Sequence, residues 1–254
     1  MQKKKRILLK IGSNTLTKET DNLSRGKIED IASQIAQLKD SCEFILVSSG
    51  AIAVAKQFVK LESKQEDVFI KQALASIGQP QLIRVYQEIF REYGLLSSQC
   101  LLSYSDFEKV QSKTNITNTI KVLVNNNYIP IINENDTVAT DEIKFGDNDK
   151  LAALTASILN VDLLIIATNT NGIYTKESIE KNAPETIAEV TNFEELKNEI
   201  VNSKSSHGSG GMESKIEAAA VAKNAAIETW IVNGLEDNFI VNAFENKTKF
   251  TRIK

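Results

Sequence analysis

Hydrophobic positions along the chain fall into two repeating patterns. Short apolar runs rich in Val, Ile and Leu are typical of buried strands, and longer stretches with an apolar residue every three or four positions are typical of amphipathic helices. Strands are predicted at 6–11, 43–48, 98–102, 128–133, 163–168, 229–233 and 249–253. Helices are predicted at 26–40, 51–58, 66–93 with a break near 78–80, 113–126, 147–160, 194–201 and 212–226. Strands that are apolar on both faces and separated by helices favour an α/β fold with a mainly parallel sheet.

Two polar segments interrupt this alternation. Residues 136–146 include Ile143 and Phe145 and are expected to form a small hairpin, whereas 176–204 are expected to be an elaborated, partly mobile region. No Gly/Ser-rich linker separates two apolar cores, so residues 1–254 are predicted to form a single domain.

Composition narrows the functional classes. A net charge of -3 and a pI near 5.5 provide no general field for nucleic acid. The cysteines, Cys42 and Cys100, end or follow apolar segments, which favours a reducing compartment over a disulfide framework. Lys10 interrupts the first apolar run before a signal sequence could form, and no window supplies the ~20 apolar residues of a membrane span. A cytoplasmic protein is expected.

Candidate chemistry gathers where predicted strands end. Lys10 ends the first strand, where burial requires an anionic partner, and Gly12 and Ser13 then offer backbone N–H groups to a phosphate. A lysine extended to solvent before a turn is the alternative interpretation. Ser49 and Gly50 follow the second strand, where the serine could cap a helix or bind a substrate carboxylate.

The richest polar segment joins the fourth strand to the next helix. Asn133, Glu134, Asn135 and Asp136 follow an apolar run, and the sequence GDND at 146–149 opens the helix. Helix capping explains one or two of these residues, not the whole set. A cluster that accepts from an ammonium group and donates to a carboxylate suits a small zwitterion such as an amino acid.

A glycine-rich segment precedes the last long helix. Its sequence, GSGGMESK at 208–215, places Lys215 one turn into the helix, so amides, helix dipole and ammonium group could together bind an anion. A flexible linker is the alternative, and the pattern is not that of a P-loop. His207 is expected to be a solvated loop residue. No cluster of residues has metal-ligand spacing, so any divalent ion is expected to arrive with a nucleotide.

Together these segments resemble the amino acid kinase superfamily, and within it the glutamate 5-kinase branch. The match runs through KIGS at 10–13, SSGAIA at 48–53, NENDTVAT at 133–140, GDND at 146–149 and GGM at 210–212 with Lys215. The resemblance implies a three-layer α/β/α sandwich and the reaction of ATP with L-glutamate to give L-glutamate 5-phosphate, the first step of proline biosynthesis. The C-terminal PUA domain of many relatives is not expected here.

The resemblance also implies roles for individual residues. Lys10 and Lys215 would flank the transferring phosphoryl group, and Asp149 would orient them, as catalytic residues. Positions matching glutamate contacts are Ser49, Gly50, Asn133, Asp136, Asp147 and Asn148. Positions matching the nucleotide side are Lys10, Gly12, Ser13, Thr168, Asn169, Ser209, Gly210, Gly211, Met212, Glu213, Ser214 and Lys215. Asn169, where many relatives carry aspartate, and Glu213 depart from the family pattern.

The implied cofactors are ATP and Mg²⁺ carried by the nucleotide, and no metal site in the protein is expected. Feedback inhibition by L-proline, with determinants at 141–145, and a homo-oligomer (dimer or tetramer) are further family expectations. Other members acting on acetylglutamate, aspartate, carbamate or UMP remain alternatives. So does a non-catalytic amino-acid-binding protein that kept the fold.

Overall fold

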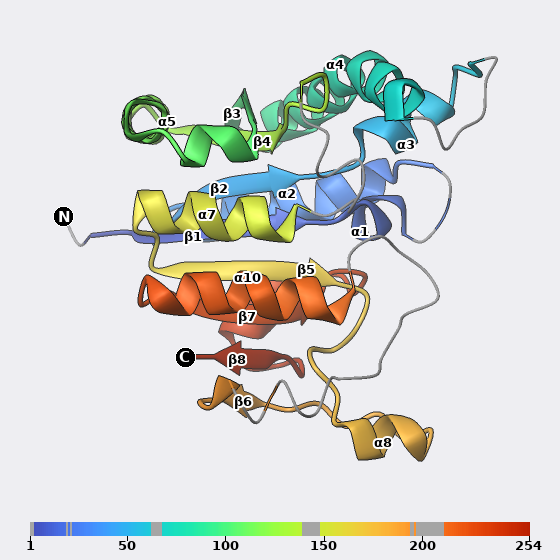
Figure 1. Cartoon of the computed structure of the whole chain (residues 1–254), viewed down its shortest axis with the longest axis vertical. Helices are drawn as coiled ribbons and strands as arrows, with labels where there is room; N and C mark the ends of the chain where they lie inside the picture. Colours follow the sequence, from blue (N-terminus) through green and yellow to red (C-terminus); the bar gives the residue numbers. More distant parts are fainter. Residues whose placement is uncertain are drawn as a thin grey trace.

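The computed structural model describes residues 3–18, 20, 22–61, 68–138, 148–193, 196 and 211–254. Its strands are β1 (Lys5–Ile11), β2 (Cys42–Ser48), β3 (Leu96–Leu102), β4 (Tyr128–Glu134), β5 (Leu163–Thr168), β6 (Glu189–Val190), β7 (Glu228–Asn233) and β8 (Thr251–Ile253). Across these residues they form one sheet in the order β3-β4-β2-β1-β5-β7-β8-β6 (Figure 1). The β7–β8 pairing is antiparallel and the others are parallel, which confirms the predicted mainly parallel sheet.

Helices cover both faces of this sheet. They are α1 (Ser13–Thr17), α2 (Arg25–Leu38), α3 (Ala51–Lys56), α4 (Val68–Glu92), α5 (Val110–Asn125), α7 (Asp149–Leu159), α8 (Lys176–Glu180), α10 (Met212–Asn224), α11 (Phe239–Phe244) and the 3₁₀ helix η1 (Tyr104–Phe107). Figure 1 shows α5, α7 and α10 in front of the sheet and α2 behind it, so the expected three-layer sandwich is confirmed. None of the helices in the described ranges combines the length and apolarity needed to cross a bilayer.

Alternation along β1 sorts its side chains between two cores. Ile7, Leu9 and Ile11 pack in the core that contains residues of α2 and α4, whereas Leu8 packs in the core beneath α7 and α10. Successive side chains of a strand point to opposite faces, so Lys10 shares the face of Leu8. The strand pattern therefore directs this lysine toward α7 and α10.

The predicted break near 78–80 is wrong. Helix α4 runs through Pro80 without interruption, although glycine and proline both weaken a helix interior. A Cβ on Gly78 would lie 1.8 Å from the carbonyl oxygen of Ala51, so the absence of a side chain lets α4 pack directly on the backbone of α3. Close helix packing offsets the unfavourable local sequence.

The polar region predicted at 176–204 contains regular structure. It holds α8 and β6, and Val190 of β6 is buried in a third hydrophobic cluster with Ile253 of β8. These elements, with the short α1, α11 and η1, are absent from the sequence prediction because they are too short to show a period. The predicted hairpin at 136–146 and helix at 194–201 fall largely outside the described residues.

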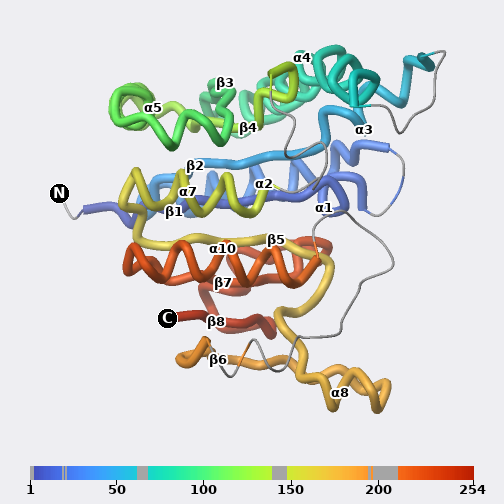
Figure 2. The backbone as a smooth tube through the Cα atoms, in the orientation of Figure 1, coloured from blue at the N-terminus to red at the C-terminus, as the bar shows by residue number. Residues whose placement is uncertain are grey.

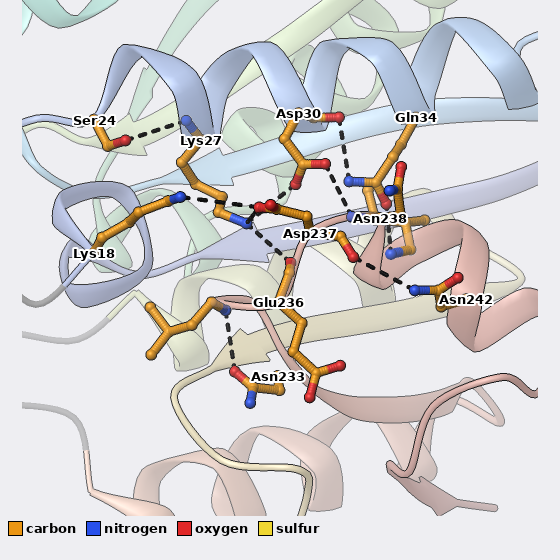
Figure 3. Close-up of polar contacts among 12 residues, drawn as sticks. Lys18, Ser24, Lys27, Asp30, Gln34, Asn233, Glu236, Asp237, Asn238 and Asn242 are labelled. Atoms are coloured by element: carbon orange, nitrogen blue, oxygen red, sulfur yellow. Dashed lines mark hydrogen bonds and ion pairs between the residues drawn. The ribbon is translucent and has the colours of Figure 1, made fainter.

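The connection from β7 to α11 is fastened to α2 by a buried lysine (Figure 3). The Lys27 ammonium group donates to Asp30 Oδ2 at 3.1 Å, to the Glu236 carbonyl oxygen at 2.9 Å and to Asp237 Oδ1 at 3.3 Å. Asp30 Oδ1 in turn accepts from the backbone N–H of Asn238 at 2.9 Å. Residues about 210 positions apart in sequence are thereby held together.

Candidate active site

The candidate site lies where the parallel strands end. Figure 2 shows α7 and α10 side by side on one face of the sheet, both starting at the edge where β1 and β5 end. In open α/β sheets the carboxyl ends of the strands form the ligand-binding edge. Asp149 is the first residue of α7, and Lys215 lies in the first turn of α10. Both are therefore brought beside Lys10, near the carboxyl end of β1.

Asp149 bridges two lysines. Its Oδ1 lies 2.5 Å from the Nζ of Lys10, and its Oδ2 lies 3.0 Å from the Nζ of Lys215. The Asp149 side chain is fully buried, and the lysine side chains are only 5% and 7% exposed. These buried ion pairs, of which the contact between Lys215 and Asp149 is also a hydrogen bond, hold both ammonium groups in fixed positions. The structure thus brings together the three residues expected to be catalytic.

Glycines and a serine surround this charged cluster. A Cβ on Gly12 would lie 3.5 Å from the Nζ of Lys10, so this glycine borders the ammonium group directly. Gly211 is the N-cap of α10, and the Ser214 hydroxyl lies 2.8 Å from its carbonyl oxygen and 3.2 Å from Asp149 Oδ2. The start of α10 therefore lies close to both lysines, an arrangement that suits an anion site.

A cluster of amide side chains adjoins the charged cluster. The Nδ2 of Asn148 donates to the Ser48 carbonyl oxygen at 2.8 Å, to Ser49 Oγ at 2.9 Å and to Asn133 Oδ1 at 2.9 Å. Asn148 is the N-cap residue of α7, yet its side chain makes no capping hydrogen bond. Simple capping therefore does not explain Asn148. Gly50 adopts φ 106°, a left-handed conformation that favours glycine, at the start of α3.

Two carboxylates lie at the end of β4, at the same edge. Glu134 is buried, and Asp136 is partly buried just beyond it. Burial, and secondarily the negative charge of Glu134, raise the pKa of Asp136 to about 6. A ligand cation beside these carboxylates would relieve that repulsion.

The nucleotide-side residues are placed less uniformly. Thr168 is buried at the end of β5 and its Oγ1 lies 3.5 Å from Asn169 Oδ1, while Asn169, Ser13 and Glu213 are exposed. Met212 packs against the third hydrophobic cluster. The exposed Glu213 side chain accommodates the departure from the family pattern at that position. Three further predicted site residues lie outside the described ranges: Asp147, Ser209 and Gly210.

Helix α4 contributes two polar contacts that the sequence did not reveal. Gln79 Oε1 accepts from Asn133 Nδ2 at 2.7 Å, and the buried Tyr86 hydroxyl lies 3.0 Å from Ser48 Oγ. Burial raises the pKa of the Tyr86 hydroxyl, which stays protonated. The sequence feature that could have revealed Gln79 was its place between Gly78 and Pro80, but this pattern predicted a break in the helix and not a polar contact.

Within the described ranges, no group of three or more His, Cys, Asp or Glu side chains is placed to hold a metal ion. The carboxylate at the centre of the site, Asp149, contacts ammonium groups instead. This donor set fits a divalent ion that arrives on nucleotide phosphates, since Mg²⁺ commonly keeps waters and binds through phosphate oxygens.

The fold and site define a class: an α/β/α protein with paired lysines and helix starts gathered at the carboxyl edge of a parallel sheet. Residues 5–233 match the Amino acid kinase family, and the chain belongs to this family. A protein named glutamate 5-kinase from Alkaliphilus metalliredigens (strain QYMF) is 38% identical over 253 residues, covering 99% of this chain and 96% of that protein. A glutamate 5-kinase from Thermoanaerobacter sp. (strain X514) is 40% identical over 246 residues, covering 96% of this chain and 66% of that protein.

Solved structures support the same architecture. Carbamate kinase from Giardia lamblia bound to AMP-PNP superposes with a TM-score of 0.69 at 19% identity, covering 100% of this chain and 99% of that chain. At this identity the likeness concerns the fold alone.

Proposed function

We propose that the protein transfers the γ-phosphoryl group of ATP to the side-chain carboxylate of L-glutamate, giving ADP and L-glutamate 5-phosphate. The observation that carries this proposal is the carboxylate of Asp149 bridging Lys10 and Lys215 directly beside the amide cluster of Asn133 and Asn148. Relatives named glutamate 5-kinase align over nearly the whole chain, which supports this acceptor. This reaction is the first step of proline biosynthesis.

The acceptor carboxylate needs no general base. A glutamate side chain has a pKa near ~4.3 and is ionised at pH 7, so it is already a nucleophile. The difficulty is to bring one anion up to another, which requires positioning and positive charge. Lys10 and Lys215 would supply that charge on either side of the transferring group, and their ion pairs with Asp149 would keep both ammonium groups in place.

The amino acid end of the acceptor suits the polar cluster. The α-ammonium group of the ligand would donate to the carboxylate of Asp136, the Ser49 hydroxyl would donate to a ligand carboxylate oxygen, and Asn148 would orient the ligand. The proposed acceptor site comprises Ser49, Gly50, Asn133, Asp136, Asp147 and Asn148.

The nucleotide would occupy the α10 side of the site. Its phosphates would lie against Lys10, Gly12, Ser13, Gly211, Ser214 and Lys215, with Thr168, Asn169 and the remaining residues of 209–213 around the rest of the molecule. Mg²⁺ bound to the phosphates neutralises part of their charge. The site residues themselves would position the nucleotide.

The test is release of ADP by the purified protein with Mg-ATP and L-glutamate, aspartate, N-acetylglutamate or no acceptor. Hydroxylamine in the same reaction traps an acyl phosphate as a hydroxamate. Glutamate-dependent ADP release with hydroxamate formation is expected. Turnover with another acceptor would move the protein to a different member of the family, and binding of both ligands without turnover would indicate a regulatory protein.

Two family traits are part of the proposal. Inhibition by L-proline is expected from determinants at 141–145, which lie outside the described residues. Assembly into a dimer or tetramer is also expected, and sedimentation of the purified protein measures it.

A further inference from the structure

Gln79 occupies an unusual position for a polar residue. It lies in the interior of α4 between Gly78 and Pro80 and is only 8% exposed. Its Oε1 accepts from Asn133 Nδ2 at 2.7 Å, and its Nε2 donates to Gln99 Oε1 at 3.3 Å. The side chain therefore links the end of β4 to the neighbouring edge strand β3, and buried amides of this kind are costly unless they are hydrogen-bonded.

Close packing of two helices puts Gln79 in reach of the site. Gly78 packs against Ala51 and Ala55 of α3, with an added Cβ lying 2.9 Å or less from their backbone atoms. Helix α3 begins immediately after Ser49 and Gly50. The glycine thus brings α4 against the start of α3, and the next residue, Gln79, faces the amide cluster.

Two backbone groups fix the orientation of the amides. The backbone N–H of Glu134 donates to Asn133 Oδ1 at 2.9 Å, so the oxygen of Asn133 points there and its Nδ2 points to Gln79. The Ser48 carbonyl oxygen accepts from Asn148 Nδ2 at 2.8 Å, so the nitrogen of Asn148 points inward. A backbone N–H can only donate and a carbonyl oxygen can only accept, so the positions of oxygen and nitrogen in the Asn133 and Asn148 amides are fixed. The hydrogen bond from Asn133 then fixes those of Gln79 as well.

This orientation leaves one acceptor of the amide cluster without a donor among the described residues. The Oδ1 of Asn148 is buried, and no donor reaches it among the residues that the structure describes. An unsatisfied buried acceptor costs stability, so its retention beside Ser49 favours a ligand that donates a hydrogen bond. An α-ammonium group is such a donor.

We infer that Gln79 is a positioning residue for the amino acid acceptor. By accepting from Asn133 it holds that amide so that Asn148 turns its Oδ1 toward the ammonium group of the bound amino acid. The inference rests on the proposed function for its ligand, an α-amino acid, and adds a residue on α4 that acts only through Asn133 and Asn148.

Steady-state kinetics of Gln79→Met and Gln79→Glu test this inference. Methionine keeps the length of the side chain and removes the hydrogen bonds, so KM for L-glutamate is expected to rise about tenfold, with kcat and KM for Mg-ATP changed less than about threefold. The Glu side chain of Gln79→Glu restores an acceptor oxygen for Asn133, and the Gln99 amide can reverse to donate to the second carboxylate oxygen, so KM for L-glutamate is expected to return to within about threefold of wild type.

A matched control and a double-mutant cycle separate positioning from stability. Tyr86→Phe removes another buried hydrogen bond between α4 and the strand ends, so it is expected to lower the melting temperature without changing KM for glutamate. In an Asn133→Ala background, Gln79→Met is expected to cause little further change, because the two residues act as one unit. If Gln79→Met does not fold, Gln79→Ala is compared with Gln79→Glu in the same way.

Unchanged KM for glutamate in Gln79→Met would overturn the inference. So would a fall in kcat accompanied by similar rises in KM for glutamate and KM for Mg-ATP. Failure of the proposed function is a separate result, visible in the wild-type protein as turnover with a different acceptor. If that acceptor is another α-amino acid, the variants are measured with it. If it lacks an ammonium group, the proposed role of Asn148 Oδ1 is overturned.

Discussion

Two buried lysine clusters lie among the residues that the structure describes, and they are built in opposite ways. In the first, a single carboxylate, Asp149, contacts two ammonium groups, those of Lys10 and Lys215. In the second, a single ammonium group, that of Lys27, is shared by two carboxylates and a backbone carbonyl oxygen. The first cluster concentrates cations, whereas the second surrounds one cation with acceptors.

The two clusters also differ in solvent exposure and in their position in the fold. Lys27 has no exposed side-chain surface and ties α2 to the connection between β7 and α11 (Figure 3). Lys10 and Lys215 keep 5% and 7% exposure at the edge where strands end and helices begin. Burial of a charged residue therefore does not by itself identify a functional site. The balance of cations and acceptors, and the place in the sheet, distinguish a structural contact from the proposed phosphate-binding site.

Asp149→Asn breaks the first cluster at its centre and should produce the largest effect. The two ammonium groups lose their shared counter-charge, and removing one partner of a buried ion pair costs about 3–5 kcal/mol of unfolding free energy. Turnover should fall as well, because the lysines are no longer held. Urea unfolding and ADP release measure the two effects on the same preparation.

The control for that change is Glu43→Gln, which removes an ion pair with Arg6 between side chains that are 25% and 30% exposed. Such partly exposed pairs contribute about 0–1 kcal/mol, so its stability should stay near wild type. Equal stabilities of Asp149→Asn and Glu43→Gln would show that the bridging contacts do not stabilise the fold.

Lys215→Ala sharpens the comparison because it separates function from folding. Lys10 still neutralises Asp149, so the fold should persist, whereas kcat should fall about 10²–10³-fold, or about 2.7–4 kcal/mol, as when one transition-state donor is lost. Glu217→Gln, on an exposed face of the same helix, is the matched control and should leave kcat unchanged. Near-wild-type turnover of Lys215→Ala would remove this lysine from the mechanism.

Lys27→Met breaks the second cluster and should show the reverse behaviour. Its loss leaves Asp30 without its lysine partner, but Asp237 is 70% exposed and rehydrates, so the expected cost is about 2–3 kcal/mol, below that of a wholly buried pair. In a chain of this length that corresponds to roughly 5–10 °C in melting temperature.

Turnover of Lys27→Met below its melting temperature should match wild type, and Lys18→Met, at an exposed lysine 3.9 Å from Asp237, should change neither quantity. A selective loss of kcat in Lys27→Met, with unchanged stability, would contradict the division between the two clusters.

The sequence predicted the first cluster and missed the second for a physical reason. Lys10 ends an apolar strand beside Gly12, and Lys215 follows a run of glycines, so each is conspicuous within a few residues of chain. Lys27 sits in an ordinary amphipathic pattern, and although Asp30 is a local partner, the other two partners lie in the connection from β7 to α11, about 210 residues away. Local pattern reveals strand ends and helix starts, but it does not reveal which distant loop closes over a helix.

The same distinction explains the fold. The long strands and helices agree with their predicted ranges to within a few residues because their hydrophobic period is strong. Helix α4 was expected to break near 78–80 because glycine and proline are unfavourable locally, and only the packing of Gly78 on α3 shows why it continues. The contact of Gln79 with Asn133 was hidden by that same misreading.

A change of pH tests the proposed amino acid site beside the first cluster, and its expected effect is the smallest. Burial and the charge of Glu134 raise the pKa of Asp136 to about 6, and the ionised form is the one that would bind an ammonium group. KM for glutamate should therefore rise as pH falls through 6, reaching about tenfold its pH 7.5 value at pH 5. Asp136→Asn should raise KM at pH 7.5 and abolish this dependence.

Stability should respond to the same titration with the opposite sign. The folded-state pKa of Asp136 lies above the unfolded value, so protonation favours the folded chain, and this contribution is lost as pH rises from about 4 through 6. Compared with pH 7.5, the wild-type protein at pH 5 should bind glutamate less well, and Asp136 should destabilise the fold less. Asp136→Asn should show neither trend. A KM that is independent of pH between 5 and 7.5 in the wild-type protein would place the ammonium group away from Asp136 and leave the amide cluster as its remaining acceptor.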